Sequence, residues 1–192
     1  DKEMNLFGFA VGAITLADEV GIDVGAHIMS GELMQEMLAL RPKFKVSKTL
    51  LEISKAGYKG RKNKKGFYKY DEKGKKVSGQ VDADIYSFYG GNTRKKFDAN
   101  EIHMRCAMAM VNEAALCLQE NIISSPLDGD IGAIFGLGFP PFRGGPFRYI
   151  DTVGAQFVVD TLNDLTAKHG ERFEPAQILV DYAKNSKKFY TE

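Results

Sequence analysis

The chain contains no tryptophan, only two cysteines and only three histidines among its 192 residues. Cys106 and Cys117 belong to one helical pattern. At about 1.5 Å of rise per residue they would lie roughly 16 Å apart, which is too far for a disulfide. We therefore expect two buried thiols in a protein of a reducing compartment. The histidines (His27, His103 and His169) are widely scattered and lack metal-ligand spacing, so no metal site is predicted.

Long apolar runs are also missing. No stretch approaches the ~18 apolar residues that a membrane-spanning helix needs, and the opening residues DKEMNLFGFA do not have the pattern of a signal peptide. The hydrophobic fraction of 44% is nevertheless sufficient for a folded core. The chain length allows one large domain or two small ones.

An excess of one charge sign is lacking as well. Because 26 basic residues face 25 acidic ones, the overall charge gives no argument for nucleic-acid binding. One local segment is basic: Lys59, Arg61, Lys62, Lys64, Lys65 and Lys69. We favour a solvated surface for this segment. Binding to CoA phosphates, to a membrane surface or to RNA are the alternatives, and RNA is the least favoured of them.

Capping and helix-ending residues divide the chain into predicted elements. Asp23 begins one helix, Asp98 and Glu101 form the capping box of the strongest helix, and Ser125 begins a helix that Gly136 ends. The predicted helices are residues 14–20, 23–37, 47–56, 98–121, 125–136, 147–153, 155–168 and 175–184. A short hairpin is predicted around GFYKYDEKG, and residues 77–97 are predicted to form a linker with one short helix.

Two parts of the chain resemble each other in order. The matching positions are Gly12 with Gly145, Asp18 with Asp151, Val20 with Val153, Gly21 with Gly154, Phe7-Gly8 with Phe135-Gly136, and KKGFY (64–68) with KKFY (187–190). This order argues for a duplication, with residues 1–96 and 97–192 as the two repeats. Asp18 and Asp151 are expected to be matching anchors between a helix and a loop.

The two predicted repeats differ at their beginning. The second opens with the long helix 98–121, and the first shows no counterpart before Phe7. We therefore expect the missing helix upstream in a longer protein, and near residues 1–40 an apolar trough, or a partner helix that fills it.

Several segments carry a resemblance to a known family. They are FGFAVGAITLADEVGIDV, GRKNKKGFYKY, VNEAALCLQE, SPLDGDIGAIFGLGFPPFRGGPFRYIDTVGA and the closing KKFY. Together they resemble, in the same order, the C-terminal helical region of the 3-hydroxyacyl-CoA dehydrogenase part of multifunctional fatty-acid oxidation enzymes, the mitochondrial trifunctional type above all. The resemblance covers almost the whole chain.

The resemblance implies an all-α fold of two pseudo-symmetric helical repeats, like the C-terminal domain of 6-phosphogluconate dehydrogenase, with one short β-hairpin. It implies that the catalytic His-Glu pair and the NAD-binding Rossmann domain lie upstream, so that this chain alone would be inactive. It also implies an acyl-CoA substrate, enoyl-CoA hydratase activity in the parent enzyme, a thiolase subunit as partner, peripheral membrane contact and a mitochondrial location. No nucleic-acid partner is expected.

Three phenylalanines of FGLGFPPFRGGPFR are candidate site residues. Phe135, Phe139 and Phe142 would line a slot for an acyl or pantetheine chain, and the favoured alternative is that they fill the core of a rigid connector. The resemblance assigns substrate binding to the aromatic position that matches Phe135.

Polar residues of the helices give weaker candidates. Asn112 takes the place of the family's substrate-contacting asparagine in the repeat comparison. The favoured alternative is a structural network in which Asn112 and Glu113 bind Arg148 and Asp151. Asp23 and His27 are four residues apart, as in a catalytic dyad, but no nucleophile accompanies them.

The sequence thus favours the substrate-side portion of a dehydrogenase. A helical module that only mediates oligomerisation or other interactions is the alternative, and an RNA-binding module is a third hypothesis.

Overall fold

The computed structural model describes residues 1–91, 93 and 95–191, and these form two compact units. Unit 1 consists of Asp1 and the described residues of Val11–Lys96. Unit 2 consists of Lys2–Ala10 and the described residues of Phe97–Glu192. Each unit has its own hydrophobic core, so each is considered separately.

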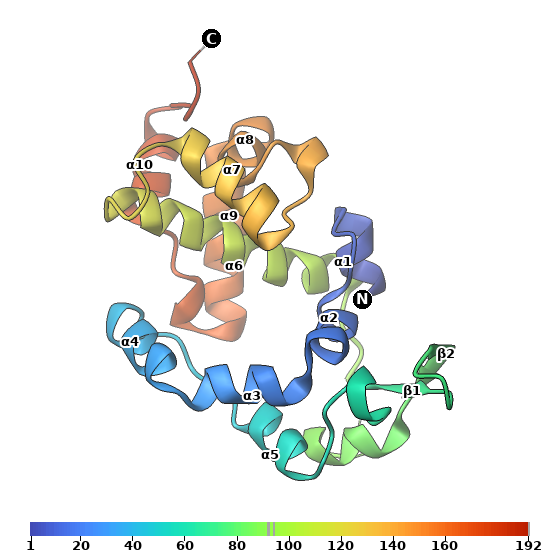
Figure 1. Cartoon of the computed structure of the whole chain (residues 1–192). Coiled ribbons are helices and arrows are strands. Elements are labelled where there is room, and N and C mark those ends of the chain that lie inside the picture. Colours follow the sequence, from blue (N-terminus) through green and yellow to red (C-terminus); the bar gives the residue numbers. More distant parts are fainter. Residues whose placement is uncertain (92, 94, 192) are drawn as a thin grey trace. The chain divides into compact units, whose positions relative to one another are not determined.

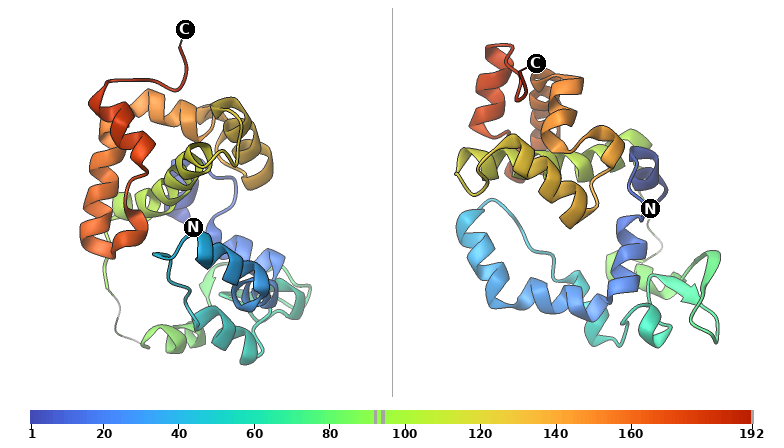
Figure 2. Two further views of the ribbon diagram at one scale, coloured as in Figure 1. Left: turned by 90° about the vertical axis from the view of Figure 1, so that its left-hand side faces the viewer. Right: turned by 45° about the horizontal axis from the view of Figure 1, so that its top comes forward.

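Unit 2 is built around the long helix α6 (Ala99–Gln119). The helices α1 (Lys2–Phe7), α7 (Pro126–Leu137), α8 (Pro146–Val153), α9 (Ala155–His169) and α10 (Gln177–Lys184) all contact α6. Figure 1 shows α1 beside the N-terminal end of α6, and Figure 2 shows α9 and α10 side by side. Two short 3-10 helices, η3 (Pro141–Arg143) and η4 (Glu171–Phe173), lie in the connections.

The core of unit 2 explains why α6 carries apolar residues around most of its surface. Met108 and Val111 are completely buried against residues of α8, α9 and α10. The helix begins as the capping box predicts, since the backbone N–H of Glu101 donates to the Asp98 carboxylate over 3.2 Å. The predicted buried α6 is confirmed.

Helix α7 begins as predicted and ends later. The Ser125 hydroxyl accepts from the backbone N–H of Asp128 at 3.1 Å, and Pro126 is the first helical residue. The predicted end at Gly136 is wrong. Gly138 ends the helix because it adopts a left-handed conformation with φ +70°, which glycine tolerates without steric cost.

Unit 1 contains shorter elements around a smaller core. Its helices are α2 (Ala13–Val20), α3 (Ile22–Ser30), α4 (Glu32–Leu40), α5 (Thr49–Lys55) and the 3-10 helices η1 (Arg61–Asn63) and η2 (Ala83–Tyr89). The buried residues at its centre are Ile22, Ile53, Tyr58, Phe67 and Ile85. The helix predicted over residues 23–37 is two helices, because Gly31 is extended and interrupts the helical backbone.

The predicted hairpin is confirmed in unit 1. Strand β1 (Tyr68–Tyr70) pairs in antiparallel fashion with β2 (Lys76–Val81), placing Tyr68 opposite Val81 and Tyr70 opposite Lys76. Figure 2 shows this hairpin projecting from the rest of unit 1. It is the only sheet among the described residues, so the all-α fold class is confirmed.

Unit 1 exposes a large number of apolar side chains on its first helices. The exposed residues are Val11, Ile14, Leu16, Val20, Val24, Ile28, Leu33 and Leu40. The part of residues 1–40 that belongs to unit 1 thus carries exposed apolar side chains, and the trough predicted there stays a prediction.

Candidate functional site

Two aspartates fix the ends of α8 in unit 2. Asp130 on α7 is buried, and its carboxylate accepts from the backbone N–H groups of Phe147 at 2.7 Å and Arg148 at 3.2 Å. These are N–H groups that the first turn of a helix leaves without an internal partner. The Tyr190 hydroxyl donates to the same carboxylate at 2.6 Å. Burial raises the pKa of Asp130, and the hydrogen bonds from these three donors oppose that rise.

The second aspartate, Asp151, lies near the other end of α8, and we call these two residues the Asp130–Asp151 pair. Its carboxylate accepts from the backbone N–H groups of Phe189 at 2.8 Å and Tyr190 at 2.9 Å. The Arg148 guanidinium lies 3.6 Å from the centre of the Tyr190 ring. The chain end is therefore held to α8 by Asp151 and Arg148 and to α7 by Asp130. Burial and the Asp130 carboxylate raise the pKa of Tyr190, which keeps its hydroxyl a donor.

The same arrangement recurs in unit 1. Asp18 is buried and accepts from the backbone N–H groups of Phe67 at 2.9 Å and Tyr68 at 3.0 Å. Asp1 accepts from the N–H of Ile14 at 2.9 Å, near the start of α2, and from the Tyr68 hydroxyl at 2.6 Å. The Asp1–Asp18 pair thus contacts α2 and a Phe-Tyr segment, Phe67-Tyr68. In the same way the Asp130–Asp151 pair contacts α8 and a Phe-Tyr segment, Phe189-Tyr190.

Two glycines allow this close approach. A Cβ on Gly12 would collide with Asp1, and a Cβ on Gly145 would collide with Asp130. The sequence comparison matched Gly12 with Gly145 and correctly predicted Asp18 and Asp151 as helix-to-loop anchors. It missed Asp1 and Asp130. The sequence signal for them was the similarity between KKGFY and KKFY, because the tyrosine hydroxyl of each segment requires a hydrogen-bond acceptor.

The structure separates the three predicted phenylalanines. Phe139 is 0% exposed and packs against the rings of Phe7, Phe9 and Tyr149, which supports the favoured alternative that its side chain fills the core. Phe135 is 85% exposed near the end of α7.

The loop after α7 is held by Arg143. Its Nε donates to the carbonyl of Phe7 at 2.8 Å, and its guanidinium lies 4.1 Å from the centre of the Phe7 ring. This contact fixes η3 against α1. It also holds Phe142, which is 73% exposed, beside Gly8 at the end of α1.

Asn112 has structural partners at both ends of its amide. Its Nδ2 donates to the carbonyl of Glu174 and its Oδ1 accepts from the N–H of Ala176, both at 2.8 Å. The predicted partners Arg148 and Asp151 are wrong, since those two side chains serve the chain end. Asn112 instead ties α6 to the segment that precedes α10.

We expect Asn112→Ala to lower the free energy of unfolding by about 1–3 kcal/mol, because the buried N–H of Ala176 loses its acceptor and the hydrogen bond to the Glu174 carbonyl is lost. Denaturant unfolding measures this, and Asn163→Ala is the control because Asn163 is exposed on α9. Unchanged stability of Asn112→Ala would contradict the structural role and favour the substrate contact.

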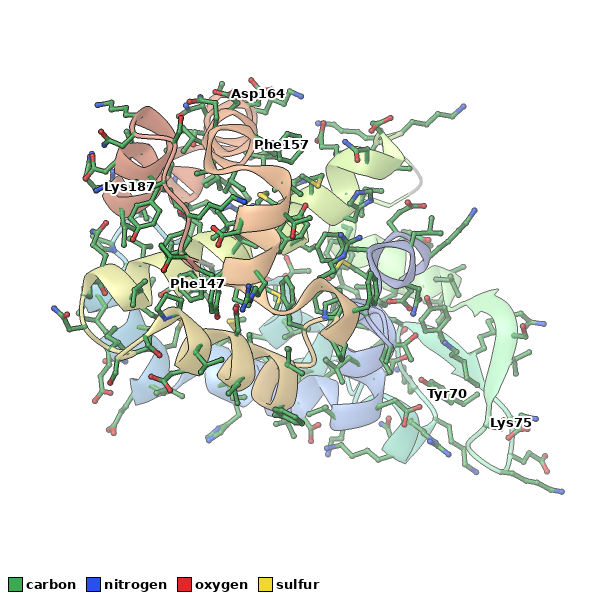
Figure 3. The ribbon with its side chains drawn as sticks, turned by 90° about the horizontal axis from the view of Figure 1, so that it is seen from above. Tyr70, Lys75, Phe147, Phe157, Asp164 and Lys187 are labelled. Atoms are coloured by element: carbon green, nitrogen blue, oxygen red, sulfur yellow. The ribbon has the colours of Figure 1, made fainter. Side chains whose placement is uncertain are left out.

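The basic segment of unit 1 is largely engaged with its own unit. Arg61 pairs with Glu19 at 2.9 Å, Lys62 pairs with Asp23, and Lys65 lies over the ring of Tyr58. The hydrogen bond from Lys62 lowers the pKa of Asp23, so this carboxylate is engaged with the basic segment. Figure 3 shows Lys75 at the end of the hairpin, pointing away from the ribbon. These contacts support the solvated surface that the sequence favoured.

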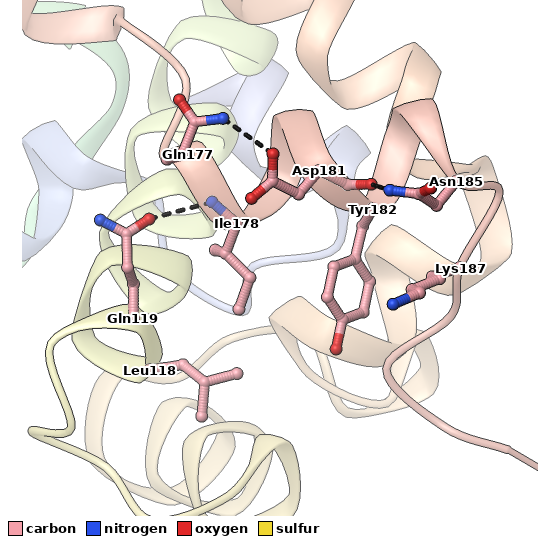
Figure 4. Close-up of a pocket in the computed structure, with 8 residues that line it drawn as sticks. All are labelled: Leu118, Gln119, Gln177, Ile178, Asp181, Tyr182, Asn185 and Lys187. Atoms are coloured by element: carbon pink, nitrogen blue, oxygen red, sulfur yellow. Dashed lines mark hydrogen bonds between the residues drawn. The ribbon is translucent and has the colours of Figure 1, made fainter.

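A shallow depression of about 560 Å³ lies between the end of α6 and α10 in unit 2. Figure 4 shows Gln119 accepting from the Ile178 N–H at 2.9 Å and Gln177 donating to Asp181 at 2.8 Å. Neither Phe135, Phe139 nor Asn112 lines it. Its amides fix the start of α10.

Two further expectations concern cysteines and membranes. The prediction of two buried thiols is wrong, because Cys106 is exposed and Cys117 is half-buried; the apolar face of α6 turns Met104 and Met108 inward instead. In the part of the chain that the structure describes, no cluster of potential metal ligands is present. No helix in that part combines the length and apolarity that a bilayer crossing demands.

The fold and the paired aspartates describe a helical domain of two units, and the comparisons give its family. The family model for the C-terminal domain of 3-hydroxyacyl-CoA dehydrogenase matches residues 1–70 and 102–190. The chain belongs to this family.

Similar proteins include fatty acid oxidation complex alpha subunits from bacteria. The Shewanella amazonensis protein is 49% identical over 190 residues, which are 99% of this chain and 26% of that protein. The Vibrio cholerae protein is 49% identical over 184 residues, which are 96% of this chain and 25% of that protein. The chain therefore spans about a quarter of the length of these relatives.

Solved structures show the same fold. The dehydrogenase part of multifunctional enzyme 1 from C. elegans has a TM-score of 0.62 and 25% identity, over 94% of this chain and 40% of that one. The 3-hydroxybutyryl-CoA dehydrogenase from Escherichia coli K12 has a TM-score of 0.65 and 18% identity, over 93% of this chain and 52% of that one.

The expected mitochondrial location is wrong. The similar alpha subunits come from Shewanella, Idiomarina and Vibrio, and bacteria have no mitochondria. The resemblance to the trifunctional type thus identified the enzyme family correctly but predicted the wrong compartment.

Proposed function

We propose that this chain is the substrate-side helical portion of an NAD-dependent 3-hydroxyacyl-CoA dehydrogenase of fatty-acid oxidation. The family match and the much greater length of the relatives support this. In the parent enzyme a hydride passes from the hydroxyl-bearing carbon to NAD while a histidine base accepts the hydroxyl proton. Both the NAD-binding domain and the histidine belong to the remainder of the parent enzyme.

The observation that carries the proposal is the exposure of Phe135. The Phe135 side chain is 85% exposed, and covering its apolar surface with a ligand would be favourable in free energy. It lies on α7, whose position is fixed by Asp130, so the unit presents it on a rigid element. Phe135 is therefore the proposed contact with the acyl part of the substrate. The burial of Phe139 and the two backbone partners of Asn112 support the alternative roles for these residues, in which Phe139 fills the core and Asn112 is structural.

The test is Phe135→Ala in the full-length dehydrogenase, with NADH formation from a 3-hydroxyacyl-CoA as the measurement. We expect kcat/KM to fall about tenfold or more because an apolar contact is lost. The stability should not change, since the side chain is exposed. Phe157→Ala is the matched control: Phe157 is an exposed aromatic residue on α9 of the same unit, and its loss should leave kcat/KM unchanged. Equal rates for both variants and the parent would refute the proposal.

We further propose that residues 1–96 and 97–192 are two copies of one ancestral repeat. The matching contacts of the Asp1–Asp18 and Asp130–Asp151 pairs support this. Enoyl-CoA hydratase activity of the parent, a thiolase subunit as partner and peripheral membrane contact are proposals that follow from the family resemblance. Copurification with a thiolase and binding to anionic vesicles test the last two.

A second candidate function is an interaction module without a role in substrate binding. The exposed apolar residues on α2, α3 and α4 favour it. Saturable binding of an acyl-CoA, abolished by Phe135→Ala, would favour the first function. Wild-type rates in the Phe135→Ala enzyme, together with assembly lost in a Val24→Asp variant, would favour the second.

A further inference from the structure

The shallow depression between the end of α6 and α10 runs along one side of α10, and we call it the α10 groove. Three polar residues that line it, Gln177, Asp181 and Asn185, follow one another at intervals of four, so they lie in one row along the helix. All three are exposed. We call them the polar row. Figure 4 shows Leu118 and Gln119 of α6 beside the start of α10.

Each residue of the polar row uses only part of its hydrogen-bonding capacity. The Gln177 Nε2 donates to Oδ1 of Asp181 at 2.8 Å, and the Asn185 Nδ2 donates to the Asp181 carbonyl at 2.7 Å. Within the part of the chain that the structure describes, the second side-chain oxygen of Asp181 and the amide oxygens of Gln177 and Asn185 have no donor. The row therefore presents three hydrogen-bond acceptors in succession.

The spacing of these acceptors matches the backbone of an extended polypeptide. Residues four apart on a helix differ in height by about 6 Å. In an extended chain the N–H groups that point to one side recur at every second residue, which is about 6.6 Å. The whole polar row rises by about 12 Å, the length of about four extended residues. Strand addition to a sheet recognises a peptide in the same way, through its main-chain groups.

The other parts of the groove also suit a polypeptide. Gln119 accepts from the Ile178 N–H at 2.9 Å, which leaves its Nε2 to donate to a peptide carbonyl. Leu118, Ile178 and Tyr182 are half-buried and pack on the core of unit 2. The Tyr182 ring stacks on Phe189 with 4.2 Å between the ring centres. The apolar part of the groove is therefore fixed before a ligand binds, which lowers the entropy cost of binding.

Other classes of ligand fit the groove less well. CoA phosphates and nucleic acids require several cations, whereas the groove contains one, Lys187, beside one anion, Asp181. Small molecules are usually enclosed by their sites, and this depression of about 560 Å³ is shallow. The end of the chain does not fill it, because the N–H groups of Phe189 and Tyr190 are held by Asp151.

We propose that the α10 groove binds an extended segment of a partner protein. The N–H groups on one side of the segment donate to the polar row, and Gln119 donates to one of its carbonyls. Alternate side chains of the segment are apolar and contact Leu118, Ile178 and Tyr182, since every second side chain of an extended chain points to the same face. This interaction does not use Phe135, so it is independent of the proposed substrate contact.

The test uses the full-length dehydrogenase and three capped hexapeptides in which alanine, valine or leucine alternates with serine. Saturation-transfer NMR detects weak binding of each peptide. Fully N-methylated analogues keep the side chains but have no N–H donor. We expect at least one hexapeptide to bind and its N-methylated analogue to lose at least about fivefold of the signal. Gln177→Leu should weaken the binding about fivefold, because one acceptor is lost.

Gln156→Leu is the matched control for Gln177→Leu. Gln156 is exposed near the start of α9 and donates to Asp160 at 2.8 Å, as Gln177 donates to Asp181 in α10. It lies outside the groove, so its replacement should leave peptide binding unchanged. Three results would each overturn the proposal: no transfer to any hexapeptide, equal transfer to the N-methylated peptides, or equal effects of the two leucine variants. A groove already filled by another part of the parent enzyme would give the first of these.

Discussion

Asp18→Ala should unfold unit 1 around the hairpin while unit 2 remains folded. Asp18 is 0% exposed and accepts hydrogen bonds from the N–H groups of Phe67 and Tyr68 and from the Tyr70 hydroxyl at 2.9 Å. Its removal leaves two backbone N–H groups and one hydroxyl without a partner, at a cost of about 1–3 kcal/mol each. The sum is comparable to the whole stability of a small domain, about 5–15 kcal/mol.

Hydrogen exchange monitored by mass spectrometry checks this expectation. Peptides that cover residues 58–81 should lose their protection in Asp18→Ala, and peptides of α6 and α9 should keep it. Asp84→Ala is the control, because Asp84 is an exposed aspartate of the same unit on η2. Retained protection of the hairpin in Asp18→Ala would show that the Asp1–Asp18 pair does not hold unit 1 together.

Gly145→Ala should destabilise unit 2 by about 3 kcal/mol or more. Gly145 has φ +101°, a conformation that strains an alanine by about 1–2 kcal/mol, and the added Cβ would collide with Asp130. Displacing Asp130 would also break its bonds to the start of α8. The consequence combines backbone strain with the loss of a buried carboxylate acceptor.

Gly136→Ala is the matched control for this prediction. Gly136 lies within α7, and a Cβ there would meet nothing within 4 Å. The same chemical change should therefore stabilise the chain by about 0.5–1 kcal/mol. Thermal or denaturant unfolding of both variants measures the contrast. Similar effects of the two substitutions would contradict the close fit between Gly145 and Asp130.

Much of the fold could be predicted from local sequence. The capping box at Asp98, the cap at Ser125 and the turn DEKG act over a few residues, and α6, α7 and the hairpin formed where they indicated. The break at Gly31 could not be predicted in this way, since glycine within an apolar pattern is compatible with a continuous helix.

The candidate site was predictable only in part. The pattern could not distinguish Phe135 from Phe139, because both belong to one apolar segment and their exposure depends on whether the chain follows α7 or the loop after Gly138. The partners of Asn112 lie more than sixty residues away in the sequence, which local spacing does not reveal. The roles of Asp1 and Asp130 depend on tyrosines that are equally remote.

The most direct test of the account maps where an acyl tail lies. A 3-hydroxyacyl-CoA with a photoreactive diazirine near the end of a long chain is bound to the full-length dehydrogenase and irradiated, and the attached residues are identified by mass spectrometry. We predict attachment within Pro126–Leu137, foremost at Phe135. Attachment confined to residues outside α7, with competition by unlabelled substrate, would contradict the account.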